Sequence, residues 1–241
     1  MRIPRLYVEA PLQPGQDCEL DQQRVHRLTR VFRLRAGAEV VAFDGSGRQF
    51  QCELLQHRRD WSLRVQREVP SLPASPVSIT LAQSIARNER MDFCLQKAVE
   101  LGVHAVQPII AEHCVAPAGR RLENRESHWR RIIEQACEQC GRSDVPELRR
   151  PVAIDEWLKN APGTIVLDVD GTQSLADVKI DRSQVTLLIG PEGGFSDQEK
   201  TLMQTLDCRR VCLGPRVLRM ETAALAAVTT IQLRAGDLAA L

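Results

Sequence analysis

The chain has 241 residues, of which 43% are hydrophobic and 26% charged, a composition that excludes the disordered and fibrous classes. The formal net charge of +1 excludes a protein that is basic throughout, yet 28 of the 32 basic residues are arginine, the side chain best suited to phosphate and to stacking on bases. Aromatic residues make up only 4%, which argues against binding of single strands on aromatic platforms.

Short apolar or alternating runs in the first 70 residues predict a small β-rich barrel. The runs cover residues 6–8, 39–43, 50–55 and 62–66, with a hairpin turn at 44–47. Residues 21–32 predict a short helix that Asp21 caps. Three prolines follow within seven residues, at 70, 73 and 76, and they indicate a semi-rigid linker and a domain boundary.

Beyond the linker, strands alternate with helices. Strands are predicted at 77–82, 105–110, 164–168, 185–189 and 210–213, and helices at 89–101, 125–140 and 221–233, with a further helix that opens at a capping box over 196–199. This alternation is typical of an α/β domain with a parallel sheet. We therefore expect a β-barrel domain over 1–70, a linker over 71–76 and an α/β domain over 77–241.

The N-terminus lacks the apolar run of a signal peptide, and no apolar stretch is long enough to span a bilayer. We therefore expect a cytoplasmic protein without a membrane anchor. Eight cysteines are scattered along the chain, and Cys137 and Cys140 have CxxC spacing. No second pair supplies the remaining ligands of a zinc site, so no metal is expected. The pair also ends a helix, where the dipole does not activate a thiol.

Charge divides at the linker. Residues 1–70 contain 12 arginines and 9 acidic residues, a net charge of +3, whereas residues 71–241 carry 20 basic and 22 acidic residues, a net charge of −2. Five arginines fall within twelve residues that contain no acid, namely Arg24, Arg27, Arg30, Arg33 and Arg35. Because a solvated surface usually mixes charges of both signs, this run predicts a phosphate-binding patch.

Two glycine turns follow predicted strands. In the first, residues 187–196 read LLIGPEGGFS, and in the second, residues 211–224 read VCLGPRVLRMETAA. Neither is a phosphate-binding loop of the Walker type, because no lysine follows the glycines, and neither contains GxGxxG. Glu192 within the first turn would repel a pyrophosphate and favours a ligand with a ribose, an adenine or a positive centre. Treated as adjacent strand ends, the two turns predict a ligand crevice at the carboxyl edge of the sheet.

Several motifs together resemble the RsmE family, ribosomal RNA (uridine-N3) methyltransferases of the SPOUT superfamily. The resemblance rests on Gly190–Gly194 (GPEGG), Leu213–Ala223 (LGPRVLRMETA), Glu138–Arg142 (EQCGR) and Gln96–Gly102 (QKAVELG), in the family's order and spacing. The opening Met1–Arg5 (MRIPR) and Phe43–Ser46 (FDGS) match the family's small PUA-like domain. Met220 departs from the family, in which many members carry threonine at that position.

The resemblance implies a C-terminal α/β domain with a deep trefoil knot, a PUA-like N-terminal β-barrel and a homodimer that packs through the knotted domains. It also implies S-adenosylmethionine as cofactor and ribosomal RNA, within the small subunit, as partner. The cofactor-binding residues that it implies are Leu167, Ile189, Gly190, Pro191, Glu192, Gly193, Gly194, Leu213, Gly214, Leu218, Thr222 and Ala223.

Catalysis at N3 of uridine requires loss of the N3 proton, so a guanidinium near O2 or O4 would stabilise the anion. Arg142 is the first candidate for this group and Arg219 the second. Either Glu221 or Glu192 could accept the proton, and the sequence does not choose between them. RNA is expected to contact the arginine cluster of residues 24–35 together with Gln139 and Cys140.

Two other functions compete with this interpretation. A nucleotide-dependent oxidoreductase would share the α/β sheet, but the chain lacks both GxGxxG and the acidic residue about 20 positions further on. A non-catalytic RNA-binding protein would share the PUA-like domain but would have no need for the two glycine turns.

Overall fold

The computed structural model describes residues 3–114, 119–180 and 183–239, so Met1 and Arg2 of the opening motif lie outside the described residues. The chain forms two compact units. One comprises Met1–Ala74 together with Glu134–Val145, and the other comprises Ser75–Ile133 together with Pro146–Leu241. The boundary near residue 74 falls within the expected linker, whereas nothing in the sequence indicated that residues 134–145 would pack with the first unit.

The first unit contains a five-stranded sheet in the order β1-β3-β4-β5-β2. The strands are β1 (Arg5–Tyr7), β2 (Asp17–Glu19), β3 (Glu39–Phe43), β4 (Gln49–His57) and β5 (Asp60–Val69). Within the described residues of this sheet, β1 and β3 pair in parallel and the other three pairings are antiparallel. Alternate residues of β4, among them Phe50, Cys52 and Leu54, are fully buried in the core of this unit, which confirms the alternating pattern.

Helix α1 (Gln22–His26) begins at the predicted cap, where the Asp21 carboxylate accepts a hydrogen bond from the Arg24 amide at 2.8 Å. The expected helix over 21–32 does not continue regularly, because residues Arg27–Val31 form a π-helical turn, η1. Residues Glu134–Val145, which lie far along the chain, also belong to this unit. There Glu138 accepts a hydrogen bond from the Tyr7 amide at 2.9 Å, and Asp144 forms β-bridges with Gly45 and Ser46.

The second unit is an eight-stranded sheet in which every recorded pairing is parallel, in the order β11-β13-β10-β12-β6-β7-β8 with β9 on β7. Its strands are β6 (Ser78–Ser84), β7 (Ala105–Ile110), β8 (Glu147–Leu148), β9 (Val152–Ala153), β10 (Ile165–Leu167), β11 (Gln173–Ser174), β12 (Gln184–Ile189) and β13 (Arg209–Cys212). The predicted α/β architecture is therefore confirmed.

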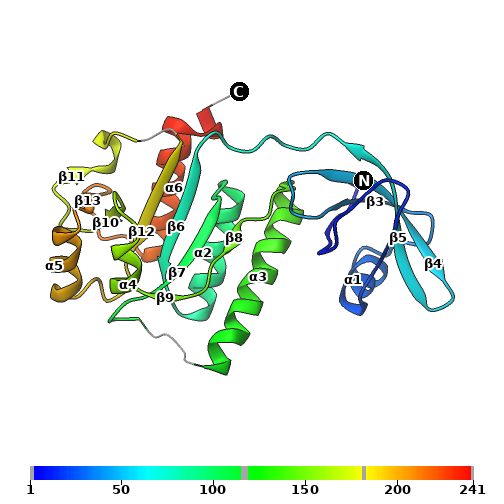
Figure 1. Ribbon diagram of the computed structural model, residues 1–241, viewed down its shortest axis with the longest axis horizontal. Helices are drawn as coiled ribbons and strands as arrows, with labels where there is room; N and C mark the ends of the chain where they lie inside the picture. The colour runs from blue at the N-terminus through cyan, green and yellow to red at the C-terminus, as the bar shows by residue number, and fades with distance from the viewer. Residues whose placement is uncertain (1–2, 115–118, 181–182, 240–241) are drawn as a thin grey trace. The chain divides into compact units, whose positions relative to one another are not determined.

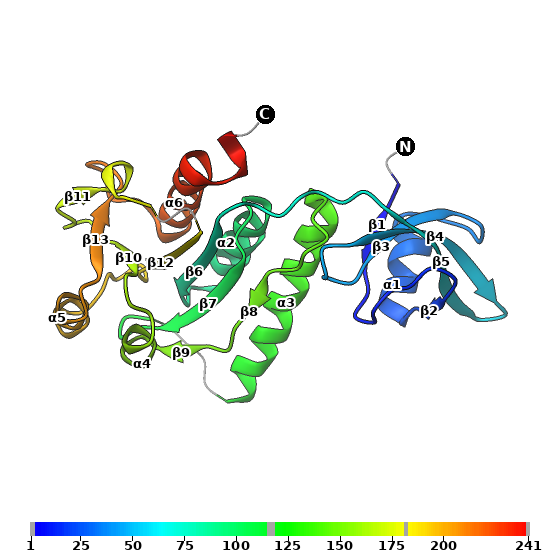
Figure 2. The same ribbon diagram turned by 45° about the horizontal axis from the view of Figure 1, so that its top comes forward.

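Helices cover both faces of this sheet (Figures 1 and 2). One face packs against α2 (Asn88–Glu100), α6 (Met220–Ala235) and Trp129 of α3 (Arg120–Cys140). The other face packs against α4 (Ile154–Lys159) and α5 (Asp197–Thr205). The 3-10 turns η2 (Leu175–Asp177) and η3 (Asp237–Ala239) complete the described elements. Among the described residues no helix combines the length and apolar character needed to cross a membrane.

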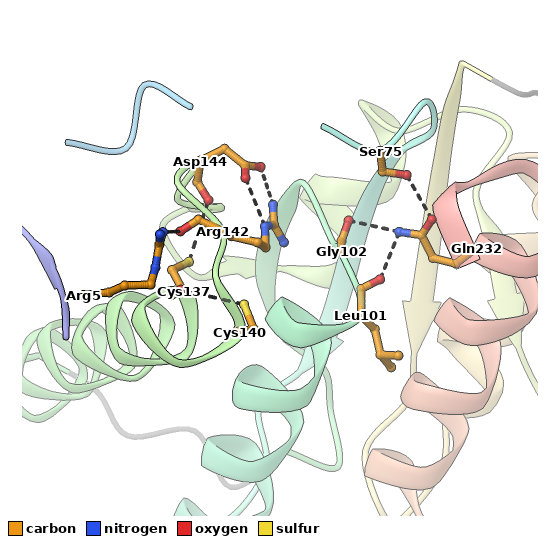
Figure 3. Close-up of polar contacts among 9 residues, drawn as sticks. All are labelled: Arg5, Ser75, Leu101, Gly102, Cys137, Cys140, Arg142, Asp144 and Gln232. Atoms are coloured by element: carbon orange, nitrogen blue, oxygen red, sulfur yellow. Dashed lines mark hydrogen bonds and ion pairs between the residues drawn. The ribbon is translucent and has the colours of Figure 1, made fainter. Parts of the chain in front are cut away.

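Gln232 of α6 is fully buried and ties three segments of the second unit together (Figure 3). Its amide nitrogen donates to the carbonyls of Leu101 and Gly102 at 2.9 and 3.2 Å, and its amide oxygen accepts from the Ser75 hydroxyl at 2.9 Å. A buried amide with all of these partners fixes α6 against the turn after α2 and against the end of the linker.

Candidate functional site

A cavity of about 750 Å³ opens at the carboxyl edge of the sheet in the second unit, where β10, β12 and β13 end. The loops that follow these three strands line it, together with the start of α6 and Arg90 of α2. From the sequence we predicted that β12 and β13, the strands before the two glycine turns, are neighbours in the sheet. This prediction was wrong. Strand β10 lies between them, and its own loop over residues 168–170 forms part of the wall.

Eleven of the twelve predicted cofactor-binding residues line this cavity. They are Leu167, Ile189, Gly190, Pro191, Glu192, Gly193, Gly194, Leu213, Gly214, Leu218 and Ala223. The twelfth, Thr222, is exposed on the first turn of α6 and does not line the cavity. Arg219, predicted as catalytic, lines the cavity at the N-cap of α6, whereas Glu221 does not.

The loop over residues 190–196 is held from two directions. Gly194 adopts φ +72°, a left-handed conformation that glycine accepts without strain, and its amide donates to the Pro191 carbonyl at 2.9 Å. The predicted capping box is confirmed, since Ser196 and Glu199 bond reciprocally at the start of α5. The other carboxylate oxygen of Glu199 accepts from the Glu112 amide at 2.8 Å, and the His113 ring lies 3.0 Å from the Gly194 carbonyl. The segment after β7 thereby anchors the loop.

Charged residues on the cavity wall were not anticipated from the sequence. Asp168, only 4% exposed, accepts two hydrogen bonds from Arg210 at 2.9 and 2.7 Å. Asp170 pairs with Lys200 at 3.3 Å, and Glu192 pairs with Arg90 at 2.9 Å. Each pair joins residues at least 30 positions apart in the chain, so no local pattern could have identified it.

The segment over residues 168–171 approaches β13 closely. A β-carbon added at Gly171 would lie 2.4 Å from the Val211 carbonyl carbon and 2.8 Å from the Cys212 nitrogen. Only glycine allows two backbones to pass at this distance. The loop after β10 is thus pressed against β13, which brings Asp168 beside Arg210.

Buried polar groups underlie the start of α6. The Gln83 amide donates to the sulfur of Met220 at 3.3 Å, and the Gln83 oxygen accepts from the Cys94 thiol at 3.4 Å. Burial, with a contribution from Glu221, raises the pKa of Cys94 to about 12. Within the described part of the chain, Oε2 of Glu221 is buried without a hydrogen-bond partner. Met220 therefore does more than fill space, because its sulfur satisfies a buried amide.

Arg142, the first catalytic candidate, belongs to the first unit, so the structure groups it with the five-stranded sheet and not with the cavity residues. Its side chain is 13% exposed and forks onto the Asp144 carboxylate at 3.2 and 2.5 Å (Figure 3). Its carbonyl accepts from Arg5 at 2.8 Å. Gln139 is exposed nearby in sequence, and the thiol of Cys140 bonds to the Cys137 carbonyl at 3.8 Å.

The arginine cluster divides into two groups. Arg24 pairs with Asp21 and donates to the Tyr7 carbonyl at 2.9 Å, and Arg27 pairs with the buried carboxylate of Glu138. These two guanidinium groups therefore help to hold the first unit together. Arg30, Arg33 and Arg35 are exposed and make no recorded ion pair among the described residues. Glu138, 111 positions further along the sequence, neutralises Arg27. The cluster itself contains no acidic residue, so the sequence did not reveal this ion pair.

Metal and redox sites find little support in the described residues. No group of three or more His, Cys, Asp or Glu side chains there could hold a metal ion. Cys137 and Cys140 are free thiols, and burial raises the pKa of Cys137 to about 12.

Comparisons with known proteins agree with this architecture. Residues 73–232 match the RNA methyltransferase domain, and residues 20–58 match the RNA methyltransferase PUA domain. The chain is 33% identical to ribosomal RNA small subunit methyltransferase E of Buchnera aphidicola subsp. Schizaphis graminum, with 98% of both chains covered. A Rickettsia conorii protein of the same name is 25% identical, over 97% of this chain and 96% of that protein.

Two solved structures are similar along nearly the whole chain. One is a Legionella pneumophila methyltransferase in complex with S-adenosylmethionine, at TM-score 0.93 and 35% identity, with 98% of this chain and 100% of that chain covered. The other is ribosomal RNA small subunit methyltransferase E of Neisseria gonorrhoeae bound to S-adenosylmethionine, at TM-score 0.89 and 34% identity, with 98% and 99% covered. The expected fold class, a SPOUT domain with a PUA-like domain, is thereby confirmed. The chain belongs to the ribosomal RNA small subunit methyltransferase E family, as its glycine turns and the cavity that they line indicate.

Proposed function

We propose that this protein transfers a methyl group from S-adenosylmethionine to N3 of one uridine in small-subunit ribosomal RNA. The observation that carries the proposal is the cavity at the carboxyl edge of the parallel sheet, lined by the glycine turns of a chain that is 34–35% identical to two proteins solved with that cofactor. Ligands of α/β sheets bind at this edge.

The residues of the cavity fit S-adenosylmethionine. A volume of about 750 Å³ lies within the usual range for small-molecule sites. Leu167, Ile189 and Leu218 offer apolar surface for an adenine ring, and the exposed backbone of the glycine turns offers hydrogen-bonding groups for a nucleoside. Asp168, Asp170 and Glu192 supply carboxylate oxygens that can accept hydrogen bonds from the ribose hydroxyls and the ammonium group. Each carboxylate is also paired with a basic side chain, so the wall is not strongly negative.

When bound, S-adenosylmethionine supplies a methyl group that its sulfonium charge has already activated. The protein must then align uridine N3 with that group and stabilise the uridine anion. We propose Arg219 for the second task, and the proposal is supported by its exposed position on the cavity wall. We keep Arg142 as a further candidate. It would need to exchange its bond to Asp144 for the oxygen of the base.

We assign proton acceptance to Glu221 in preference to Glu192. Glu192 is exposed and already bound to Arg90, whereas Oε2 of Glu221 is buried without a hydrogen-bond partner among the described residues. A buried, unbonded carboxylate oxygen is costly and is typical of a group that awaits a donor. Glu221 belongs to the first turn of α6, next to residues that line the cavity.

We infer that residues 1–70, together with residues 134–145 of the first unit, form the RNA-binding domain. Residues 71–76 would be the linker and the rest of residues 77–241 the methyltransferase domain. The exposed guanidinium groups of Arg30, Arg33 and Arg35, with Gln139 and Cys140, would contact RNA, while Arg24 and Arg27 would support them. We also propose a homodimer through the alanine-rich α6, where Leu233 is 53% exposed, and action in the cytoplasm on the small subunit.

The test is transfer of a labelled methyl group to small-subunit ribosomal RNA, followed by mass analysis of the nucleosides. We expect 3-methyluridine at a single site. Arg219→Ala should lower kcat by roughly 10²–10³-fold, as expected when a donor that stabilises an oxyanion is lost. Arg149→Ala is the control, since Arg149 is a surface residue paired with Glu147 outside the cavity. If Arg219→Ala transfers methyl groups at the wild-type rate, Arg219 does not stabilise the uridine anion. The same result for Arg142→Ala would exclude Arg142 from that role.

Glu221→Gln tests the proton acceptor separately. It should reduce kcat by roughly 10²–10⁴-fold, while KM for S-adenosylmethionine stays unchanged. Glu192→Gln is the comparison, and a larger loss there than at Glu221 would reverse the assignment.

Ligand stabilisation separates the competing functions. S-adenosylhomocysteine at about 100 times its Kd should stabilise the folded state by about 2.7 kcal/mol, whereas NAD should not. Stabilisation by NAD alone would favour an oxidoreductase, and RNA binding without any label transfer would favour a non-catalytic RNA-binding protein.

A further inference from the structure

The turn after α1 has an unusual backbone. The Phe32 amide donates to the Arg27 carbonyl five residues earlier at 3.0 Å, and the Leu34 amide donates to the Leu28 carbonyl six residues earlier at 2.9 Å. Arg33 between them adopts φ +56°, which is unfavourable for a side chain that is not glycine. Such widened turns and left-handed residues occur often at functional sites. Leu28, fully buried, anchors the turn to the core of the first unit.

This backbone directs apolar and cationic side chains outward together. Val31 is 64% exposed and Phe32 is 39% exposed. Arg30, Arg33 and Arg35 beside them are exposed, with no recorded ion pair among the described residues. A lone exposed apolar residue needs no explanation, but here Val31 and Phe32 are exposed on a strained turn that also carries three exposed arginines without a recorded ion pair among the described residues.

The ring is also held in place. The Arg27 guanidinium lies 5.7 Å from the centroid of the Phe32 ring, a cation–π contact. Arg27 is itself fixed by Glu138, whose side chain is 6% exposed and whose other oxygen accepts from the Tyr7 amide at 2.9 Å. The chain of contacts from Tyr7 through Glu138 and Arg27 therefore limits the motion of Phe32 before any ligand arrives, which reduces the entropy lost on binding.

We propose that Phe32 is a stacking site for an unpaired RNA base, with Arg30, Arg33 and Arg35 on the neighbouring phosphates. The proposal rests on the proposed function, from which the RNA substrate follows, and it adds a subsite for a base away from the cofactor cavity. An aromatic face accepts any base, and exposed arginines accept the backbone that connects bases. An enzyme that acts on N3 requires unstacked RNA, which presents such bases. The low aromatic content does not exclude stacking when a single ring is presented in this way.

The experiment measures the affinity of the full chain for two fluorescein-labelled RNAs of equal length, a hairpin with an unpaired uridine-containing loop and a fully paired duplex. Phe32→Ala should weaken binding of the loop RNA by roughly 5- to 150-fold, which is the affinity that stacking of one base on one aromatic ring typically contributes. It should barely change binding of the duplex. Phe32→Leu, which keeps apolar contacts without a π-face, should behave like Phe32→Ala. Phe32→Trp should bind the loop RNA at least as well as the wild type.

A matched pair of arginines tests the phosphate contacts. Arg33 and Arg58 are both exposed, both belong to the first unit and both adopt left-handed backbone, with φ +56° and +57°. Arg33→Gln should weaken binding of both RNAs, and the number of counterions released on binding should fall by about one. Arg58→Gln should leave both affinities unchanged. An equal loss in the two variants would mean general surface charge and would overturn the proposal.

Other outcomes are equally decisive. The base subsite is overturned if Phe32→Ala and Phe32→Leu bind the loop RNA as the wild type does, or if they lose loop and duplex RNA equally. It is also overturned if the turn binds vesicles of anionic lipid and not RNA. Wild-type methyl transfer with unchanged binding by Phe32→Ala refutes this inference alone. Phe32-dependent binding of loop RNA without methyl transfer refutes the proposed function alone.

Discussion

Arg210→Gln would strand a buried carboxylate on the wall of the cofactor cavity. Asp168 is 4% exposed, and one of its oxygens accepts both hydrogen bonds from Arg210, at 2.9 and 2.7 Å. Among the described residues, the other oxygen accepts only from the Asp170 amide, at 3.0 Å. Removal of one partner of a buried ion pair usually costs about 3–5 kcal/mol, because the remaining charge lacks both water and a counterion.

The reverse substitution should cost less. In Asp168→Asn the amide oxygen can still accept from Asp170, and Arg210, which is 20% exposed, can reach water. We expect a loss of about 1–2 kcal/mol for this variant. The double variant should be more stable than Arg210→Gln, with an interaction free energy of about 1–3 kcal/mol between the two sites.

Chemical and thermal unfolding measure these differences. A loss of about 3–5 kcal/mol corresponds to a fall in Tm of roughly 6–20 °C for a chain of this size. Arg149→Gln is the matched control, since its pair with Glu147 at 3.0 Å lies in solvent and should contribute no more than about 1 kcal/mol. The reasoning is refuted if Arg210→Gln costs less than about 1 kcal/mol, or if Asp168→Asn is the more damaging variant.

Three further predictions concern the cofactor loop, an acidic turn and the thiols. Gly194→Ala should weaken S-adenosylmethionine binding about fivefold by calorimetry, because a left-handed alanine costs about 1 kcal/mol; Gly163→Ala, at φ +73° outside the cavity, should not. Burial by itself would raise the pKa of Asp44, but hydrogen bonds from Ser46 and Leu12 outweigh this effect, so the pKa is lowered overall. Because the folded pKa is lowered, Asp44→Asn should cost about 1–3 kcal/mol at pH 7. The difference from wild type should begin to shrink as the pH falls through about 4 and should be lost only below the lowered folded pKa, in urea unfolding at each pH. Burial raises the pKa of three thiols to about 12, so iodoacetamide at pH 8 should label them only after unfolding, as judged by peptide mass spectrometry; they are Cys52, Cys94 and Cys137. An Asp44→Asn difference that does not shrink as the pH falls from about 5 to about 2, or labelling of native Cys94, would contradict the last two predictions.

Local sequence signals predicted the elements around the site well, since such signals depend on neighbours in the chain. The Asp21 cap and the Ser196–Glu199 capping box are both present. The predicted strand at 105–110 matches β7, and the predicted helix at 125–140 begins five residues earlier, at Arg120. The short elements β2, β8, β9, β11 and α4 were missed, because two to six residues carry too little periodicity.

Pairing of distant segments was beyond reach of the same signals. Strand β10 separates β12 from β13, so a third loop enters the cavity and brings Asp168 to Arg210. Glu138 neutralises Arg27 across more than a hundred residues and changes that arginine from a free phosphate ligand to a structural one. The π-helical turn that exposes Phe32 lies where the sequence predicts an ordinary helix.

The amino-acid sequence thus determined where strands, helices, caps and glycine turns occur, and through its motifs the family. These features depend on contacts within a few residues, which propensity and periodicity record. The tertiary structure alone decided which strand ends meet at one edge, which carboxylate neutralises which guanidinium, and which arginines form no ion pair among the described residues. Those outcomes depend on the order of strands in the sheet and on the packing of segments remote in sequence, and no local pattern encodes either.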